Sequence, residues 1–145
     1  MKTWRMNNRG AALVEFALIA LLLMTLAIGI IDFGLLAKDK LSLGGAAREG
    51  AREAALGGNR TSVTNVVNAS APKPTEGEKL EVSLWYRDPA AGEGWTPYVE
   101  PVDITTTAAN VQIKVGVVYT CNRVAGAFLG TNPISLSTEE VMRRE

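Results

Sequence analysis

A long apolar run near the start dominates the pattern of hydrophobic and polar positions. Between residues 11 and 31 every side chain is apolar or small except Glu15 and Thr25. A helix of about 20 residues, rising 1.5 Å per residue, crosses a hydrocarbon core of about 30 Å. Because apolar residues continue beyond this run without a proline, we predict a transmembrane and stalk helix over 11–42.

Small residues at helical spacing predict a helical region over 43–71. Gly44 and Gly45 are expected to bend the chain, and an alanine-rich helix over 46–56 comes next. A partner helix or a neighbouring subunit is the functional interpretation of its stripe of small residues, whereas its charged residues are expected to form a solvated face. Asn59 is expected to cap a second, shorter helix.

Period-two alternation replaces the helical pattern after a proline-containing linker over 72–79. Apolar and polar residues alternate over 80–87 and, most regularly, over 111–119, and a shorter candidate strand lies at 102–104. We therefore predict a small β-rich extracytoplasmic head over 80–145. The fold class is α+β, with a small antiparallel sheet of three or four strands packed on the second helical region.

Two segments of the head leave alternatives open. The loop 88–101 is rich in glycine and proline, and its Trp95 and Tyr98 are expected either to fold back onto the sheet or to contact an adjacent subunit. Residues 133–137 alternate like a strand, but Ser137 to Glu140 matches a helix capping box that would begin a short helix through Met142.

Composition excludes several kinds of chemistry. The chain has 15 basic and 15 acidic residues without a basic patch, so we expect no nucleic-acid partner. Histidine is absent and Cys121 is the single cysteine, which excludes a Cys/His nucleophile, a His-based metal site and an intrachain disulfide. Cys121 itself is expected to be buried, with intermolecular pairing as the alternative. We expect no enzyme activity, no cofactor and no metal, because no spacing ties the acids of the head loop to a nucleophile; these acids are Asp88, Glu93, Glu100 and Asp103.

A basic leader, residues 1–10, precedes the apolar run. Lys2, Arg5 and Arg9 carry three positive charges without an acid, and the positive-inside rule then leaves the N-terminus in the cytoplasm. A secretory signal ends in a small-residue cleavage site after its apolar run, whereas here Gly10 lies before it. A cut after Gly10 would therefore leave the membrane helix attached to the head.

Glu15 is out of place in an apolar helix. A carboxylate at mid-helix costs about 2.5–3.5 kcal/mol on insertion scales, so a functional partner is the default hypothesis. A cut after Gly10 would give Ala11 a free amino group, and the amine of a neighbouring subunit displaced by a short axial step would then meet Glu15. The alternative interpretation is a frayed helix start at which the carboxylate reaches interfacial water.

The segment from Gly10 to Ala17 resembles the start of type IV pilin-like proteins. Their signature is a basic leader ending in glycine, which a prepilin peptidase removes, followed by a glutamate as the fifth mature residue; counted from Ala11, Glu15 is fifth. Within this class the chain is most similar to the TadE-like pseudopilins, or minor pilins, of tight-adherence (Flp pilus) systems. The alanine-rich segment 46–52 resembles theirs, and the resemblance favours a closing strand after Ser137.

The resemblance implies a non-catalytic subunit of the bacterial inner membrane that enters a tight-adherence pilus or its secretion machinery. Its implied processing site is Gly10 and Ala11, and its implied assembly residue is Glu15. Prepilin peptidase, other pilin or pseudopilin subunits, an inner-membrane assembly platform and the lipid membrane are the implied partners. The alternatives are a type II secretion pseudopilin, or a single-pass anchored extracytoplasmic binding protein or enzyme that keeps its leader.

Overall fold

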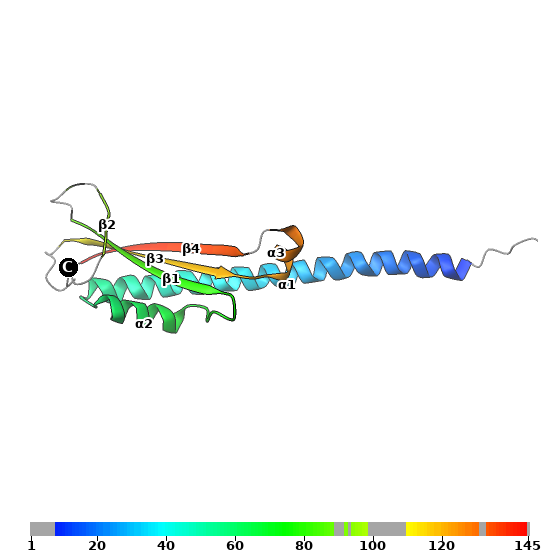
Figure 1. Cartoon of the computed structure of the whole chain (residues 1–145), viewed down its shortest axis with the longest axis horizontal. Coiled ribbons are helices and arrows are strands. Elements are labelled where there is room, and N and C mark those ends of the chain that lie inside the picture. Colours follow the sequence, from blue (N-terminus) through cyan, green and yellow to red (C-terminus); the bar gives the residue numbers. More distant parts are fainter. Residues whose placement is uncertain (1–7, 89–91, 93, 99–109, 131–132, 145) are drawn as a thin grey trace, which may run out of the picture.

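One helix runs the length of the molecule (Figure 1). The computed structural model describes residues 8–88, 92, 94–98, 110–130 and 133–144. In these, α1 spans Asn8–Ala55, 48 residues. It passes through Gly44 and Gly45 without ending, although each glycine costs about 1 kcal/mol in a helix interior. The expected bend does not interrupt the helix, because Leu43, Ala46 and Ala47 on either side are fully buried in the core.

A second helix returns along the last turns of α1. Gly57, at φ 93°, starts the reversal, and α2 (Arg60–Ser70) follows. The Asn59 side chain accepts a 2.7 Å hydrogen bond from the backbone N–H of Ser62, which confirms the predicted cap. Val63 and Val67 are buried against α1, where a Cβ on Gly50 would lie 2.5 Å from Val67. The two helices therefore approach closely through small residues.

Among the described residues of the head, four strands form an antiparallel sheet. Its strands are β1 (Lys79–Arg87), β2 (Thr96–Pro97), β3 (Gln112–Cys121) and β4 (Ile134–Arg143), in the order β2-β1-β3-β4. A short helix, α3 (Val124–Leu129), connects β3 to β4. The α+β class and the closing strand are confirmed. The pattern had not predicted β2 and α3, and the candidate strand at 102–104 lies outside the described residues.

The core lies between one face of this sheet and the two long helices. α1 contacts β3 and β4, and α2 contacts α1 and β1. The alanine stripe of α1 is buried in this core, so the chain covers it with its own sheet and second helix rather than leaving it for a partner. The principal buried residues are Leu43, Ala46, Ala47, Ala51, Ala54, Val63, Val67, Leu84, Val111, Ile113, Val115, Val117, Tyr119 and Cys121.

The aromatic residues of the head loop fold back onto the sheet. Tyr98 is buried, and its backbone N–H donates a 2.9 Å hydrogen bond to Leu84 of β1. Trp95 lies on the opposite, outer face, where the amine of Lys114 is 5.1 Å from its ring centre and 4.5 Å from that of Trp85. The first of the two predicted alternatives is therefore correct for both residues within this chain.

Candidate processing and assembly site

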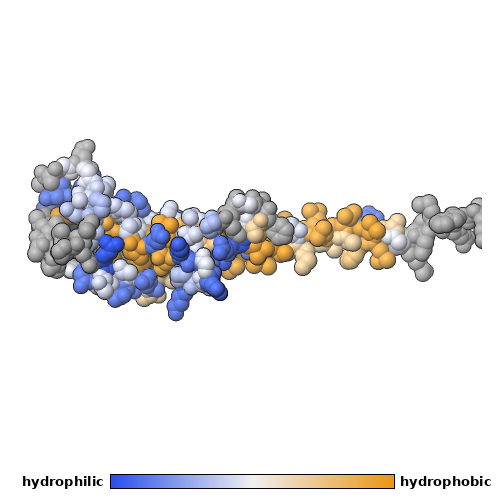
Figure 2. Space-filling model, viewed as in Figure 1, coloured by the Kyte–Doolittle hydropathy of each residue, from blue (hydrophilic) through white to orange (hydrophobic). Residues whose placement is uncertain are grey.

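The first half of α1 is bare. Its large apolar side chains from Leu13 to Ile31 are more than half exposed except for Ile28, and Figure 2 shows them as an apolar rod that projects from a largely polar head. In the described part of the chain, one helix is long and apolar enough to cross a membrane, and none of its most apolar window is buried. A core helix of a soluble protein would be covered, so this exposure indicates a helix anchored in lipid.

The three predicted site residues lie at the start of this rod. Gly10 is within the first helical turns, where none of the described residues comes within 4 Å of a Cβ built on it, and Ala11 and Glu15 are exposed. A spacing of four residues places Ala11 and Glu15 on the same side of α1, about one turn apart. The helix alone brings these residues together, because the head lies at the other end.

Glu15 is also without an ion-pair partner among the residues that the structure describes. The other polar residue of the apolar run, Thr25, donates a 2.8 Å hydrogen bond to the carbonyl of Leu21 and is thus satisfied inside the helix. Glu15 therefore remains as the polar group of this segment to which the described residues give no ion pair.

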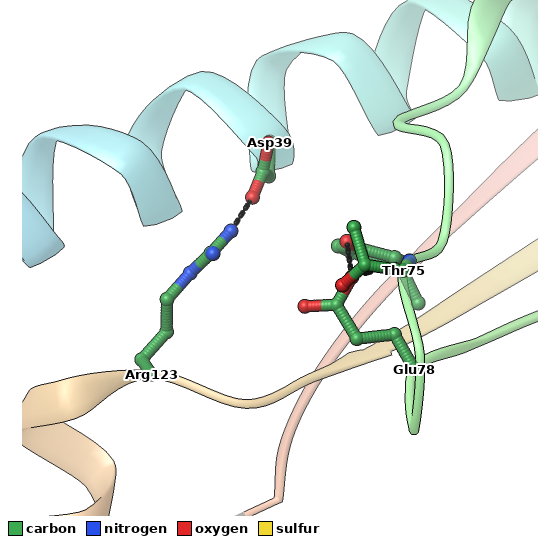
Figure 3. A network of polar contacts seen from close by, with 5 residues as sticks. Asp39, Thr75, Glu78 and Arg123 are labelled. Carbon is green, nitrogen blue, oxygen red and sulfur yellow. Dashed lines mark hydrogen bonds and ion pairs between the residues drawn. The ribbon is translucent and has the colours of Figure 1, made fainter.

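A second group of polar residues joins the head to α1. Asp39, which is buried, pairs with Arg123 at the end of β3 (Figure 3). Burial alone would lower the pKa of Arg123, but the charge of Asp39 and the hydrogen bond to it outweigh burial and raise that pKa. This ion pair connects the stalk to the sheet over a sequence separation of 84 residues.

Glu78 is the centre of a neighbouring hydrogen-bond network. It accepts bonds from the backbone N–H (2.9 Å) and hydroxyl (2.8 Å) of Thr75, and from the hydroxyl of Tyr119 (2.8 Å). Burial alone would raise the pKa of Glu78, but these hydrogen bonds lower it to about 2. Burial, together with the bond to Glu78, raises the pKa of Tyr119. The network joins the linker to β3.

These two clusters border an open cleft of about 340 Å³, and their polar contacts hold the head to α1 and to the linker. Its polar lining includes Lys38, Asp39, Lys73, Glu78, Tyr119 and Arg123. Asp39 is paired with Arg123, and Glu78 accepts hydrogen bonds from Thr75 and Tyr119. Within the described ranges no three His, Cys, Asp or Glu side chains gather to hold a metal ion. Cys121 is buried as predicted, and burial raises the pKa of its thiol.

Sequence reasoning missed the head-to-stalk ion pair. Asp39 and Arg123 lie on different elements, and nothing in their local patterns connects them. One signal was present: Asp32 and Asp39 are seven residues apart, on one side of a helix whose residues between them are apolar or small except Lys38. Both acids are buried in the structure. Buried acids usually have partners, so this spacing indicates that the head covers that side of α1.

The bare apolar rod and the covered stalk indicate a membrane-anchored protein with a folded head. Residues 10–52 match the family model described as TadE-like protein, which confirms the predicted resemblance over the apolar helix and the alanine-rich segment. The match supports a pilin-related component of a tight-adherence system, a structural rather than catalytic kind of protein whose partners are other pilus subunits and the membrane. No curated protein and no solved structure matches the chain.

Proposed function

We propose that this protein is a non-catalytic pilin-like subunit of the inner membrane, cleaved after Gly10 by a prepilin peptidase and assembled through α1 into a tight-adherence pilus or its base. The observation that carries the proposal is Glu15, an exposed carboxylate in a bare apolar helix, four residues after Ala11. The N-terminus remains cytoplasmic during insertion, and the head is extracytoplasmic. An inner-membrane assembly platform would receive the cleaved subunit.

The ion pair between Glu15 and the amine of Ala11 on a neighbouring subunit would fix the axial register of the two helices more than it would stabilise their contact. Two unit charges 4 Å apart attract by about 4 kcal/mol at an effective dielectric constant near 20. Burying the carboxylate of Glu15 in lipid costs about 2.5–3.5 kcal/mol, which nearly cancels that gain. The pair with the amine of Ala11 on a neighbour would therefore select one axial displacement, roughly one helical turn, while the apolar surfaces of the two helices supply the adhesion.

The position of the scissile bond supports a role for glycine. Because α1 begins at Asn8, the bond between Gly10 and Ala11 lies in the first turns of a helix. A peptidase acts on extended backbone, so this turn has to open before cleavage. Helix ends fray, and glycine lowers the cost of opening by about 1 kcal/mol relative to alanine.

The test compares three full-length chains in a host that has the matching peptidase and pilus genes. Glu15→Gln removes the charge. The matched control, Val14→Glu with Glu15→Val, keeps composition and charge but turns the carboxylate by about 100° around the helix. Intact mass measures cleavage, and sheared surface fractions measure assembly. We expect all three chains to begin at Ala11 and both variants to lose assembly at least tenfold.

Two results would contradict the proposal. A native chain that keeps Met1 while the peptidase is active would indicate an uncleaved anchor, as in a membrane-tethered binding protein. Normal assembly of the displaced-carboxylate control would mean that Glu15 serves only as a polar group at a helix start.

A further inference from the structure

We propose that α3 is a second membrane contact: this short apolar helix rests in the lipid interface beside α1 and sets how the head is turned on the bilayer. The inference rests on α1 spanning a membrane but not on cleavage or assembly. Three observations carry it: where the bare part of α1 ends, where α3 is held, and what α3 exposes.

The bare part of α1 ends where a bilayer would end. Asp32 is the first buried residue along the helix, and the side chains before it are exposed or half-buried. The segment 11–31 is about 20 residues long and therefore rises about 30 Å, the thickness of a hydrocarbon core. A bilayer filled by this segment has its outer surface at Asp32, without a length of exposed stalk between lipid and head.

α3 is the head element nearest to that surface. It contacts α1 and, in Figure 1, lies beyond the ends of β1 and β4 toward the bare half of the helix. Arg123, the residue before α3, pairs with Asp39, two turns along α1 from Asp32. The ion pair thus ties the start of α3 to a point on α1 about 10 Å above the inferred bilayer surface.

The chemistry of α3 suits an interface and not bulk water. Its six residues, VAGAFL, include no polar side chain. Gly126 is buried, whereas Val124 is 51% exposed and Ala127 is also exposed, so this apolar helix leaves part of its surface uncovered. The exposed cations Lys38 and Lys73 line the adjacent cleft, at a height where lipid headgroups are expected.

The experiment uses the full chain in phosphatidylcholine and phosphatidylglycerol vesicles, with a fluorophore on one introduced cysteine. The test positions are Val124→Cys and, as a second site on the same helix, Ala127→Cys. The matched control is Val141→Cys on β4, whose parent side chain is 48% exposed against 51% for Val124. The unsubstituted chain measures labelling of Cys121, which is buried.

We expect blue-shifted emission at positions 124 and 127 and at least threefold stronger quenching there than at 141 by lipids that carry a nitroxide near the headgroup. Equal, weak quenching at all three positions would refute the contact. Equal, strong quenching would also refute it, because the head would then lie on the membrane without preference for α3. A blue-shifted label that lipid quenchers do not reach would place a second copy of the chain over α3 and would refute it as well.

Discussion

Three acidic residues of α1, Glu15, Asp32 and Asp39, lie in different surroundings. Asp39 is buried and paired with Arg123, and Asp32 is buried by the head. Glu15 lies on the bare rod, and the described residues offer it no ion pair. A carboxylate buried by its own chain contributes to the fold, whereas one left in an apolar, exposed segment needs a partner from another molecule. This difference separates Glu15 from Asp32 and Asp39 and supports its proposed role in assembly.

Glu78 gives the head a defined acid sensitivity. Its pKa falls from an ordinary 4.5 to about 2 on folding. A depressed carboxyl pKa adds stability that is fully present above about pH 4.5 and is lost as pH falls toward 2. We expect Glu78→Gln to lower the free energy of unfolding by about 1.5 kcal/mol at pH 7, since it removes charge-assisted hydrogen bonds.

Thermal unfolding of the detergent-solubilised chain, followed by tryptophan fluorescence at several pH values, measures this effect. The difference between the parent and Glu78→Gln should shrink between pH 4.5 and 2. Glu76→Gln, an exposed acid of the same turn, is the control and should follow the parent. A Glu78→Gln difference that stays constant down to pH 2 would show that the ionised carboxylate is not what stabilises the turn.

At the scale of elements, two glycines of α1 have opposite surroundings. A Cβ on Gly50 would lie 2.5 Å from Val67 of α2, whereas nothing lies within 4 Å of a Cβ on Gly45. Overpacking costs about 1–3 kcal/mol, and alanine recovers up to about 1 kcal/mol of helix propensity. We expect Gly50→Ala to destabilise the head by about 1–2 kcal/mol and Gly45→Ala to stabilise it by about 0.5–1 kcal/mol.

Urea unfolding of both variants in the same detergent measures the change in the free energy of unfolding that each substitution causes, and we expect the two changes to have opposite signs. Gly45→Ala is the matched control, because it makes the same substitution in the same helix five residues earlier. Stabilisation by both substitutions would mean that α2 moves away from α1 at little cost, and the close approach at Gly50 would then not be a constraint on the fold.

The elements that the sequence predicted are those whose evidence is local. Period-two alternation predicts β1 and β3, and Asn59 predicts the start of α2. The pattern left β4 ambiguous between a strand and a capped helix, and the family resemblance favoured the strand. α3 escaped prediction because six apolar residues with a glycine are too short to show helical periodicity. β2 has two residues and exists through its pairing with Trp85 and Tyr86 of β1. Gly44 and Gly45 predicted a bend from local propensity, but burial of their neighbours outweighs that propensity.

The same distinction holds for the candidate site. The motif that contains Gly10, Ala11 and Glu15 is contiguous, so counting along the chain was enough to find it. The pair Asp39 and Arg123 depends on folding over a long sequence separation and could not be found that way. The alanine stripe was ambiguous for a physical reason: small residues indicate close packing but do not indicate whether the same chain or another one supplies the contact.

At the scale of the whole molecule, the surroundings of α1 change near Asp32, the first buried residue along the helix and the inferred edge of the bilayer. Leu22 and Leu26 lie in the bare half and are 71% and 60% exposed; Leu35 and Leu41 lie beyond the boundary and are 40% and 77% exposed. Exposure alone therefore does not separate the two pairs. The membrane does, because an arginine at the centre of a spanning helix costs about 2.5–3.5 kcal/mol, whereas near the interface its long side chain reaches water.

We therefore expect Leu22→Arg with Leu26→Arg to cost roughly 5–7 kcal/mol of insertion energy and to remove most of the protein from alkali-washed membranes. Leu35→Arg with Leu41→Arg adds the same two charges and should remain in the membrane fraction. Immunoblots of total and washed membranes from the native host compare the pairs. If both pairs leave the membrane, the bilayer extends past Asp32 to Leu41 and α3 lies deeper than inferred; if both remain, the bare half of α1 does not span a bilayer, and its apolar surface must be covered by protein.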